Sequence, residues 1–176
     1  MKICIAGKMG SGKDTVADYL VENYGYEKKA FADDMRLFLE AYMRVNKEHK
    51  NYRKIMQTFG TDIVRNLVDE DFWLNRLLEQ IKHPMIVVSD ARFINEVEGL
   101  KNKGFITLRI ISNEIRREQI GIEHRSETEL DTYNKWDYII ENNGSLEELY
   151  EKVNLFLHMF QVKREYPNLM EKIGNL

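Results

Sequence analysis

GKMGSGKDT (residues 7–15) is the stretch that decides the fold of this 176-residue chain. Gly7, Gly12 and Lys13 fall at the spacing of the phosphate-binding pattern G-x-x-x-x-G-K-[ST], but Asp14 follows the lysine and the hydroxyl comes one residue later, at Thr15. The apolar run KICIA (residues 2–6) leads into this turn, and a helical pattern follows it. A strand, a glycine-rich turn and a helix in this order predict a bound phosphate.

The turn supplies the groups that hold a nucleotide phosphate. Glycines let successive N–H groups point at one anion, and the lysine reaches the β- and γ-phosphates. The aspartate either ligates Mg²⁺ or only places a negative charge in the first helical turn, in which case the threonine supplies the oxygen. The residues that we assign to the nucleotide phosphates and Mg²⁺ are Gly10, Ser11, Gly12, Lys13, Asp14 and Thr15.

Composition narrows the class of protein. The chain is 43% hydrophobic with a formal charge of −3, and its basic residues are interleaved with acids, which argues against polymeric nucleic acid as a partner. Cys4 is the only cysteine, so no intrachain disulfide or thiolate metal cluster can form. No apolar run approaches the roughly 20 residues that cross a bilayer, and no signal peptide is evident, so we expect a cytoplasmic protein without a membrane partner.

Strand-like and helix-like patterns alternate along the chain, which predicts an α/β protein with a parallel sheet. Three of the strand-like runs are nearly continuously apolar, as in strands that helices cover on both faces. The five runs are residues 2–6, 27–32, 85–89, 106–111 and 137–141. The last helix has a start signal, because Ser145 and Glu148 fit a capping box.

Two connections are longer than a simple crossover needs. About fifty residues separate the second and third runs and contain three helical patterns, and a charged interval (residues 112–136) separates the fourth and fifth. Such inserts emerge at the carboxyl ends of the strands, where ligands bind in open α/β sheets. We therefore expect both to hold substrate.

Five blocks, in this order, resemble the deoxynucleoside monophosphate kinases of phages and bacteria. They are GSGKDTVADYL (10–20), QTFGTDIVRNLVDEDFW (57–73), VVSDARFINEVEGLKNKG (87–104), HRSETELD (124–131) and DYIIENNGSLEELYEKV (137–153). The chain is more distantly similar to dephospho-CoA kinases and animal-type phosphomevalonate kinases. The resemblance implies a P-loop NTPase fold of the nucleoside monophosphate kinase type, with a five-stranded parallel sheet.

That fold implies a single kinase domain. Its parts would be a core (1–32, 84–111 and 137–162), an acceptor-binding insert (33–83), a lid region (112–136) and a C-terminal extension (163–176). The implied reaction is ATP- and Mg²⁺-dependent phosphorylation of a deoxynucleoside 5'-monophosphate to the diphosphate. Phosphorylation of another small acceptor such as dephospho-CoA, or nucleotide binding without transfer, remain alternatives. Apolar residues among the insert helices leave a homodimer open.

Four arginines and one aspartate carry the implied chemistry. Arg65 and Arg92 match acceptor-binding positions and would clamp the monophosphate, although on sequence alone Arg65 equally fits a solvated helix surface. Arg116 and Arg117 open the lid, and one of them would close over the donor phosphates. Asp90 ends an apolar strand as a Walker B acid would; it holds a magnesium-bound water, binds the acceptor or caps the next helix.

The remaining acceptor contacts rest on the resemblance. Asp33 and Arg36 follow the second strand, where Asp33 equally fits a helix N-cap. Gln57 and Trp73 would line the base pocket, although a tryptophan is more often a core residue. Asn95 and Glu96 bind sugar or base, or are helix surface.

Two further segments complete the predicted sites. His124, Ser126 and Glu127 would face the acceptor, unless Ser126 caps a short helix with Glu129. Asn142 and Asn143 form a turn that, in similar kinases, wraps the adenine through backbone groups.

Overall fold

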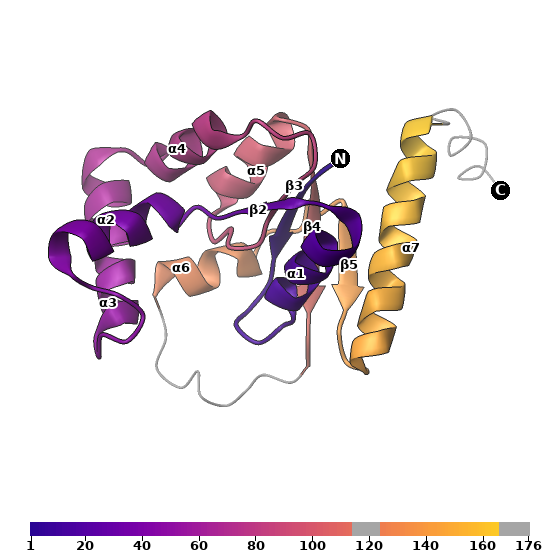
Figure 1. Cartoon of the computed structure of the whole chain (residues 1–176), viewed down its shortest axis with the longest axis horizontal. Coiled ribbons are helices and arrows are strands. Elements are labelled where there is room, and N and C mark those ends of the chain that lie inside the picture. The colour runs from indigo at the N-terminus through magenta and orange to yellow at the C-terminus, as the bar shows by residue number, and fades with distance from the viewer. Residues whose placement is uncertain (114–123, 166–176) are drawn as a thin grey trace.

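The computed structural model describes residues 1–113 and 124–165 of the chain. Its centre is a five-stranded, fully parallel sheet with the order β2-β3-β1-β4-β5 (Figure 1). The strands are β1 (Lys2–Ala6), β2 (Glu27–Lys29), β3 (Ile86–Val88), β4 (Phe105–Ile111) and β5 (Tyr138–Glu141). The predicted α/β class and strand number are confirmed, with strand ends that differ by up to three residues.

Helices cover both faces of the sheet, as the apolar strands predict. Ile3 and Ile5 of β1 point towards α1 (Lys13–Tyr24) and α7 (Leu146–Glu165), whereas Cys4 between them points to the opposite face. All three side chains are completely buried. Alternate residues of a strand therefore enter two separate cores, and a run without polar residues is the consequence.

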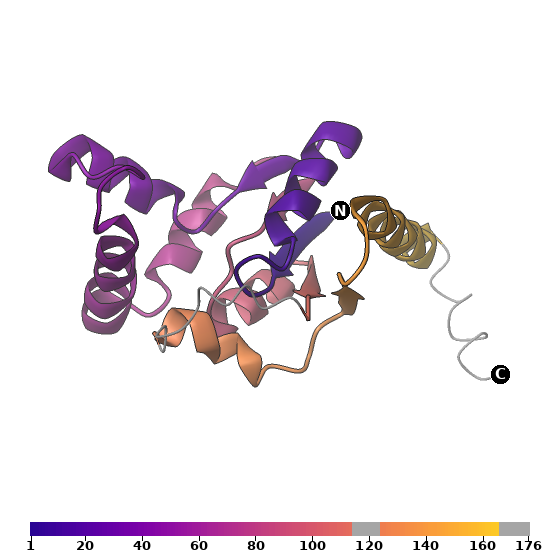
Figure 2. The same ribbon diagram turned by 90° about the horizontal axis from the view of Figure 1, so that it is seen from below.

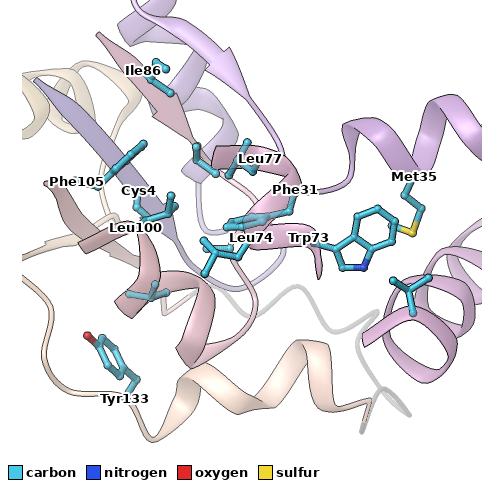
Figure 3. Close-up of a cluster of buried hydrophobic side chains, with 14 of the residues drawn as sticks. Cys4, Phe31, Met35, Trp73, Leu74, Leu77, Ile86, Leu100, Phe105 and Tyr133 are labelled. Carbon is cyan, nitrogen blue, oxygen red and sulfur yellow. The ribbon is translucent and has the colours of Figure 1, made fainter. Parts of the chain in front are cut away.

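The core around Cys4 extends from the sheet into the insert. It includes Leu100 of α5 (Ile94–Asn102) and Leu74 of α4 (Phe72–Gln80), and it continues past Phe31 to Trp73 and Met35 (Figure 3). One continuous apolar cluster thus joins the sheet to the segment expected to hold substrate, which fixes the position of that segment.

The insert forms three helical rods at the β2 side of the sheet, away from α7 (Figures 1 and 2). They are α2 (Asp33–Met43), a continuous rod of α3 (Tyr52–Gln57) and η1 (Thr58–Val68), and α4. The rod changes from α-helical to π-helical at Thr58, a local widening that often occurs at functional sites.

The apolar stripes of the insert are only partly buried. Met35 and Leu39 of α2 are buried, but Phe38 and Tyr42 from the same stripe are 42% and 77% exposed. Phe38 stacks with ring centroids 5.3 Å apart on Phe59 of η1, which is partly buried and packs against the core, so the stripe continues outwards from the core to the surface. Among the described residues, no helix is both long and apolar enough to span a membrane.

The described end of the predicted lid contains α6 (Arg125–Thr128) and the 3-10 helix η3 (Glu129–Asp131). Arg116 and Arg117 lie outside the described residues. At the end of the chain, Ser145 Oγ accepts from the Glu148 amide at 3.3 Å, as the capping signal before α7 predicts.

Candidate active site

The phosphate loop connects β1 to α1 and takes its shape from two glycines in the left-handed region. Gly10 has φ of 79° and Gly12, the N-cap of α1, has φ of 96°. A Cβ on Gly12 would also lie 2.5 Å from Asn142 Nδ2. That amide donates to the Ser11 carbonyl at 2.9 Å, so the turn after β5 fixes the loop from outside. Gly12 therefore satisfies both a backbone and a space requirement.

The loop also contains a buried hydroxyl group to which no described residue is hydrogen-bonded. Ser11 Oγ is buried and has no hydrogen-bond partner in the described part of the chain. Buried hydroxyls are normally bonded, so an unpaired one in a glycine-rich turn fits a ligand that supplies the partner. Together with the N-terminus of α1, this arrangement fits the phosphates of a nucleotide.

Lys13 and Asp14 begin α1 and lie next to each other. The lysine side chain is 9% exposed, and its Nζ lies 3.5 Å from Asp14 Oδ2. The other carboxylate oxygen accepts from Ser89 Oγ at 3.0 Å, which brings the end of β3 against the loop. Thr15 is half-buried one residue further along α1.

These oxygens could supply only part of the ligands of a magnesium ion. The described residues contain no group of three or more histidine, cysteine or acidic side chains that could enclose a metal. Mg²⁺ in kinases takes one or two carboxylates and completes its shell with water and substrate phosphates. Asp14, which is 64% exposed and next to a hydroxyl, fits that requirement.

Asp90 makes backbone contacts in the structure that the sequence does not suggest, and it also lines the cavity described below, so its predicted role at magnesium or the acceptor stays a prediction. Its two carboxylate oxygens accept from the amides of Phe31 and Ala32 at 2.9 and 3.1 Å, and burial raises its pKa. These bonds also explain why β2 ends at Lys29 and not at residue 32 as predicted, because the amides of Phe31 and Ala32 bind the Asp90 carboxylate. Asp90 joins the sheet to the insert, and Ser89, which the sequence analysis missed, is the residue of β3's end that contacts Asp14.

A cavity of about 320 Å³ opens beside the loop, between the sheet and the insert. Met9 of the phosphate loop forms part of its wall. Eight of the predicted residues also line it, namely Arg36, Gln57, Trp73, Asp90, Arg92, Glu96, Ser126 and Glu127. A volume of this size is typical of small-molecule sites, and these residues come from segments far apart in the sequence.

Arg65 does not line the cavity, in contrast to the predicted clamp. Its side chain is 1% exposed, and the guanidinium carbon lies 3.8 Å from the centre of the Phe93 ring. Its Nη atoms donate to the Glu70 carbonyl at 2.9 Å and to Asn95 Oδ1, and Glu96 Oε1 is 3.8 Å away. The guanidinium is therefore enclosed by protein and joins η1 to α5.

Three other predicted contacts also lie outside the cavity. Asn95 is bonded to Arg65 and to the segment before α4. His124 is the N-cap of α6, where its Nδ1 accepts from the Ser126 amide at 3.3 Å. Asp33 is the first residue of α2, whose N-cap is Ala32; its oxygens accept from the Ala30 amide and from Arg36. Asn95 thus links α5 to the insert, His124 caps α6, and Asp33 supports an arginine of the cavity wall.

One end of the cavity has the features of a base pocket. Trp73 lines it and donates from Nε1 to the Gly60 carbonyl at 2.9 Å, so the ring belongs to the core and to the cavity wall at once. Gln57 Nε2 is buried without a hydrogen-bond partner among the described residues. An amide that lacks a partner beside an aromatic wall fits a heterocyclic base that supplies one.

Glu96 is a carboxyl group in the cavity wall that is almost completely buried. Its Oε2 accepts from the amides of Arg92 and Phe93 at 2.8 and 3.2 Å, which caps α5. Burial raises the pKa of Glu96 to about 7, against the opposite effect of these amides. The group therefore titrates near neutral pH.

Arg53 is a cavity residue that the sequence analysis missed. It lies on α3 and donates from Nη2 to Glu127 Oε1 at 3.2 Å, while Arg92 Nη1 donates to Glu127 Oε2 at 2.6 Å. Its spacing was a usable signal, because residues 53 and 57 are four apart on one predicted helix and so share a face. The cavity thus contains two arginine forks that meet at one carboxylate.

The predicted adenine turn lies at the other side of the phosphate loop. Asn142 holds the Ser11 carbonyl, and Asn143 Oδ1 accepts from the Asn113 amide at 2.7 Å. Both side chains hold backbone in place, which leaves the backbone of the turn itself for any contact with a base.

Comparison of this sequence with known proteins matches it to a kinase family. The model of the family described as "Deoxynucleotide monophosphate kinase" matches residues 40–153. A candidate deoxynucleotide monophosphate kinase of Acanthamoeba polyphaga mimivirus is 29% identical, over 86% of this chain and 93% of the viral protein. The deoxynucleotide monophosphate kinase of Escherichia phage RB69 is 31% identical. That match covers 60% of this chain and 44% of the phage protein.

The solved structures agree on the fold. The shikimate kinase of Aquifex aeolicus has a TM-score of 0.62 at 20% identity, with 92% of this chain and 99% of that one covered. At this identity the likeness shows a P-loop kinase fold and leaves the acceptor undetermined.

Proposed function

The chain belongs to the deoxynucleotide monophosphate kinase family, and on this premise we propose that it transfers the γ-phosphate of ATP to a deoxynucleoside 5'-monophosphate. The observation that carries the proposal is the position of the arginine-containing cavity beside the phosphate loop, whose Met9 forms part of the cavity wall. Two anion sites that adjoin in this way suit transfer of a phosphoryl group between two phosphates, which is mainly a matter of positioning and charge.

On the donor side, the loop amides and Lys13 would bind the β- and γ-phosphates. The lysine is largely buried, so its charge acts on the transferring group with little screening by water. Asp14, with Ser89 behind it, would hold Mg²⁺, which supplies neutralisation of the phosphate charge when bound. Arg116 and Arg117 remain predicted to add positive charge from the lid.

On the acceptor side, Arg92 and Arg53 would bind the monophosphate through their planar forks. Arginine suits this role because two of its N–H groups can bind two oxygens of one phosphate. Gln57 and Trp73 would contact the base at the insert end of the same cavity. The acceptor oxygen would then approach the donor across the wall that Met9 forms.

An assay of ADP release over a panel of acceptors tests the proposal. The panel contains the four common deoxynucleoside monophosphates, their ribose counterparts and dephospho-CoA. ADP release that depends on a deoxynucleoside monophosphate is expected. Activity on dephospho-CoA alone would overturn the nucleotide assignment, and slow ATP hydrolysis that no acceptor accelerates would favour a nucleotide-binding module without transfer.

A further inference from the structure

Glu127 occupies the point where two arginines of the acceptor cavity, Arg53 and Arg92, meet. Arg92 reaches one oxygen of its carboxylate at 2.6 Å and Arg53 reaches the other at 3.2 Å. The Glu127 side chain is 12% exposed, whereas those of Arg53 and Arg92 are 42% and 30% exposed. The carboxylate is thus more enclosed than the cations that it pairs with, and it lies in the wall of the cavity.

The backbone of Glu127 is held independently of its side chain. Lys8 of the phosphate loop donates to the Glu127 carbonyl at 2.7 Å and pairs with Asp131 at 2.5 Å. Arg109 of β4 donates to the Leu130 carbonyl, which fixes the next turn against the sheet. The carboxylate can therefore leave the arginines by rotation of its own side chain, without displacement of α6.

We propose that Glu127 is an internal stand-in for the acceptor's phosphate: its single negative charge offsets part of the positive charge of Arg53 and Arg92 when no phosphate is bound, and it must be displaced when a phosphate binds there. This inference rests on the proposed function only for the identity of the acceptor; the anion site itself follows from the two arginine contacts. A carboxylate and a phosphate that bind the same guanidinium groups carry charges of the same sign within a few ångströms, so they compete.

The competition has a consequence for specificity. A ligand gains only the difference between its own contact with the arginines and the contact that Glu127 gives up. A phosphate dianion, with three acceptor oxygens, can exceed one carboxylate, whereas a neutral nucleoside or a lone carboxylate on a ligand gains little. Glu127 thereby favours ligands that carry a terminal phosphate.

Removal of the negative charge of Glu127 tests the proposal directly. In Glu127→Gln the side chain keeps its size but loses its negative charge, so the positive charge of the two arginines is no longer partly offset. We expect inorganic phosphate and the deoxynucleoside monophosphates to bind this variant about three- to tenfold more tightly than the unmodified protein, because the repulsion between the Glu127 carboxylate and the phosphate is removed. The parent deoxynucleosides should bind with unchanged affinity. The measurement is an equilibrium titration of the full chain without ATP.

Glu70→Gln is the matched control. Glu70 Oε1 also lies between two arginines, 3.3 Å from Arg65 and 3.5 Å from Arg125, but Glu70 does not line the cavity. The control changes the net charge equally and should leave phosphate affinity unchanged. Equal tightening in both variants would mean that only overall charge matters, and it would overturn the proposal.

A second variant keeps the test decisive if Glu127→Gln folds poorly in thermal denaturation. Glu127→Asp retains the charge but withdraws the carboxylate by one methylene, and it should tighten phosphate binding by a smaller factor. Unchanged or weaker phosphate binding in folded Glu127 variants would overturn the proposal, since it would make Glu127 a support for the arginines. Because inorganic phosphate is the probe, failure of the kinase assay would leave this result unaffected.

Discussion

The phosphate loop binds with the backbone of consecutive residues, whereas the acceptor cavity is built from side chains of distant segments. In the loop, residues 7–15 provide glycine turns, a helix N-terminus and one lysine. In the cavity, Arg53, Arg92 and Glu127 come from α3, the end of β3 and α6 and meet only in the folded chain. A short motif therefore identifies the first site, while the second needs the arrangement of the whole domain.

The largest expected effect lies on the loop side. Lys13→Ala removes the buried cation beside the donor phosphates, so we expect kcat to fall about a hundred- to a thousandfold while the fold is retained. The measurement is ADP release together with circular dichroism. Lys28→Ala is the control, because Lys28 pairs with Asp18 at the surface. Undiminished turnover in Lys13→Ala would refute the proposed donor site.

Two arginines that the sequence predicts as one clamp should respond differently, because Arg92 lines the cavity and Arg65 does not. Arg92→Ala should weaken binding of the acceptor about ten- to a hundredfold, the value of a charged hydrogen bond, with little loss of stability. Arg65→Ala should instead lower the free energy of unfolding by about 3–5 kcal/mol, because it leaves buried partners without their cation. Urea denaturation and acceptor titration separate the two.

Arg65 also offers a way to break the comparison. If Arg65→Ala lost acceptor affinity at unchanged stability, Arg65 would bind the monophosphate as the sequence predicts. The acceptor site could then be predicted from a short motif, as the phosphate loop can.

Glu96 should make stability depend on pH. Its pKa is about 7 in the fold and 4.5 in the unfolded chain, so the unfolded chain loses the proton first and stability falls as pH rises from about 4.5 to 7. We expect a contribution of about 2 kcal/mol between pH 5 and pH 7 that Glu96→Gln abolishes, measured as the difference between the urea-unfolding free energies of the two proteins. Parallel pH profiles would contradict this.

The smallest effect tests the backbone of the loop. Gly12→Ala and Gly25→Ala both place a side chain in the left-handed region, so each should cost about 1–2 kcal/mol of stability. Only the first puts a Cβ against Asn142, whereas nothing lies within 4 Å at Gly25. Loss of ATP affinity is therefore expected in Gly12→Ala alone, and equal ATP affinity in both variants would show that the loop tolerates a side chain.

The sheet and its layers could be predicted because each strand carries its own signal. The run from Lys2 to Ala6 is apolar on both sides, and the structure buries both sides. The end of β2 could not be predicted, since it depends on amides of Phe31 and Ala32 that bind a carboxylate 59 and 58 residues away.

The candidate site shows the same limit. Lys13 stands in a motif whose spacing determines its surroundings. Arg65 and Arg53 lie on one helical rod twelve residues apart in the sequence, and no local pattern tells which one is enclosed by Phe93, Glu70 and Asn95. That distinction comes from how α4 and α5 pack against the rod, which is a property of tertiary structure.

The strand order also bears on how the chain folds. The central strand β1 pairs only with β3 and β4, so the first strand to be synthesised waits for partners that begin at Ile86 and Phe105. Such long-range pairing is slow to form, and until it does the apolar run before the phosphate loop has no sheet to join. The nucleotide-binding motif is therefore made before the strands that hold it, and it takes its final position only once β3 and β4 have paired with β1.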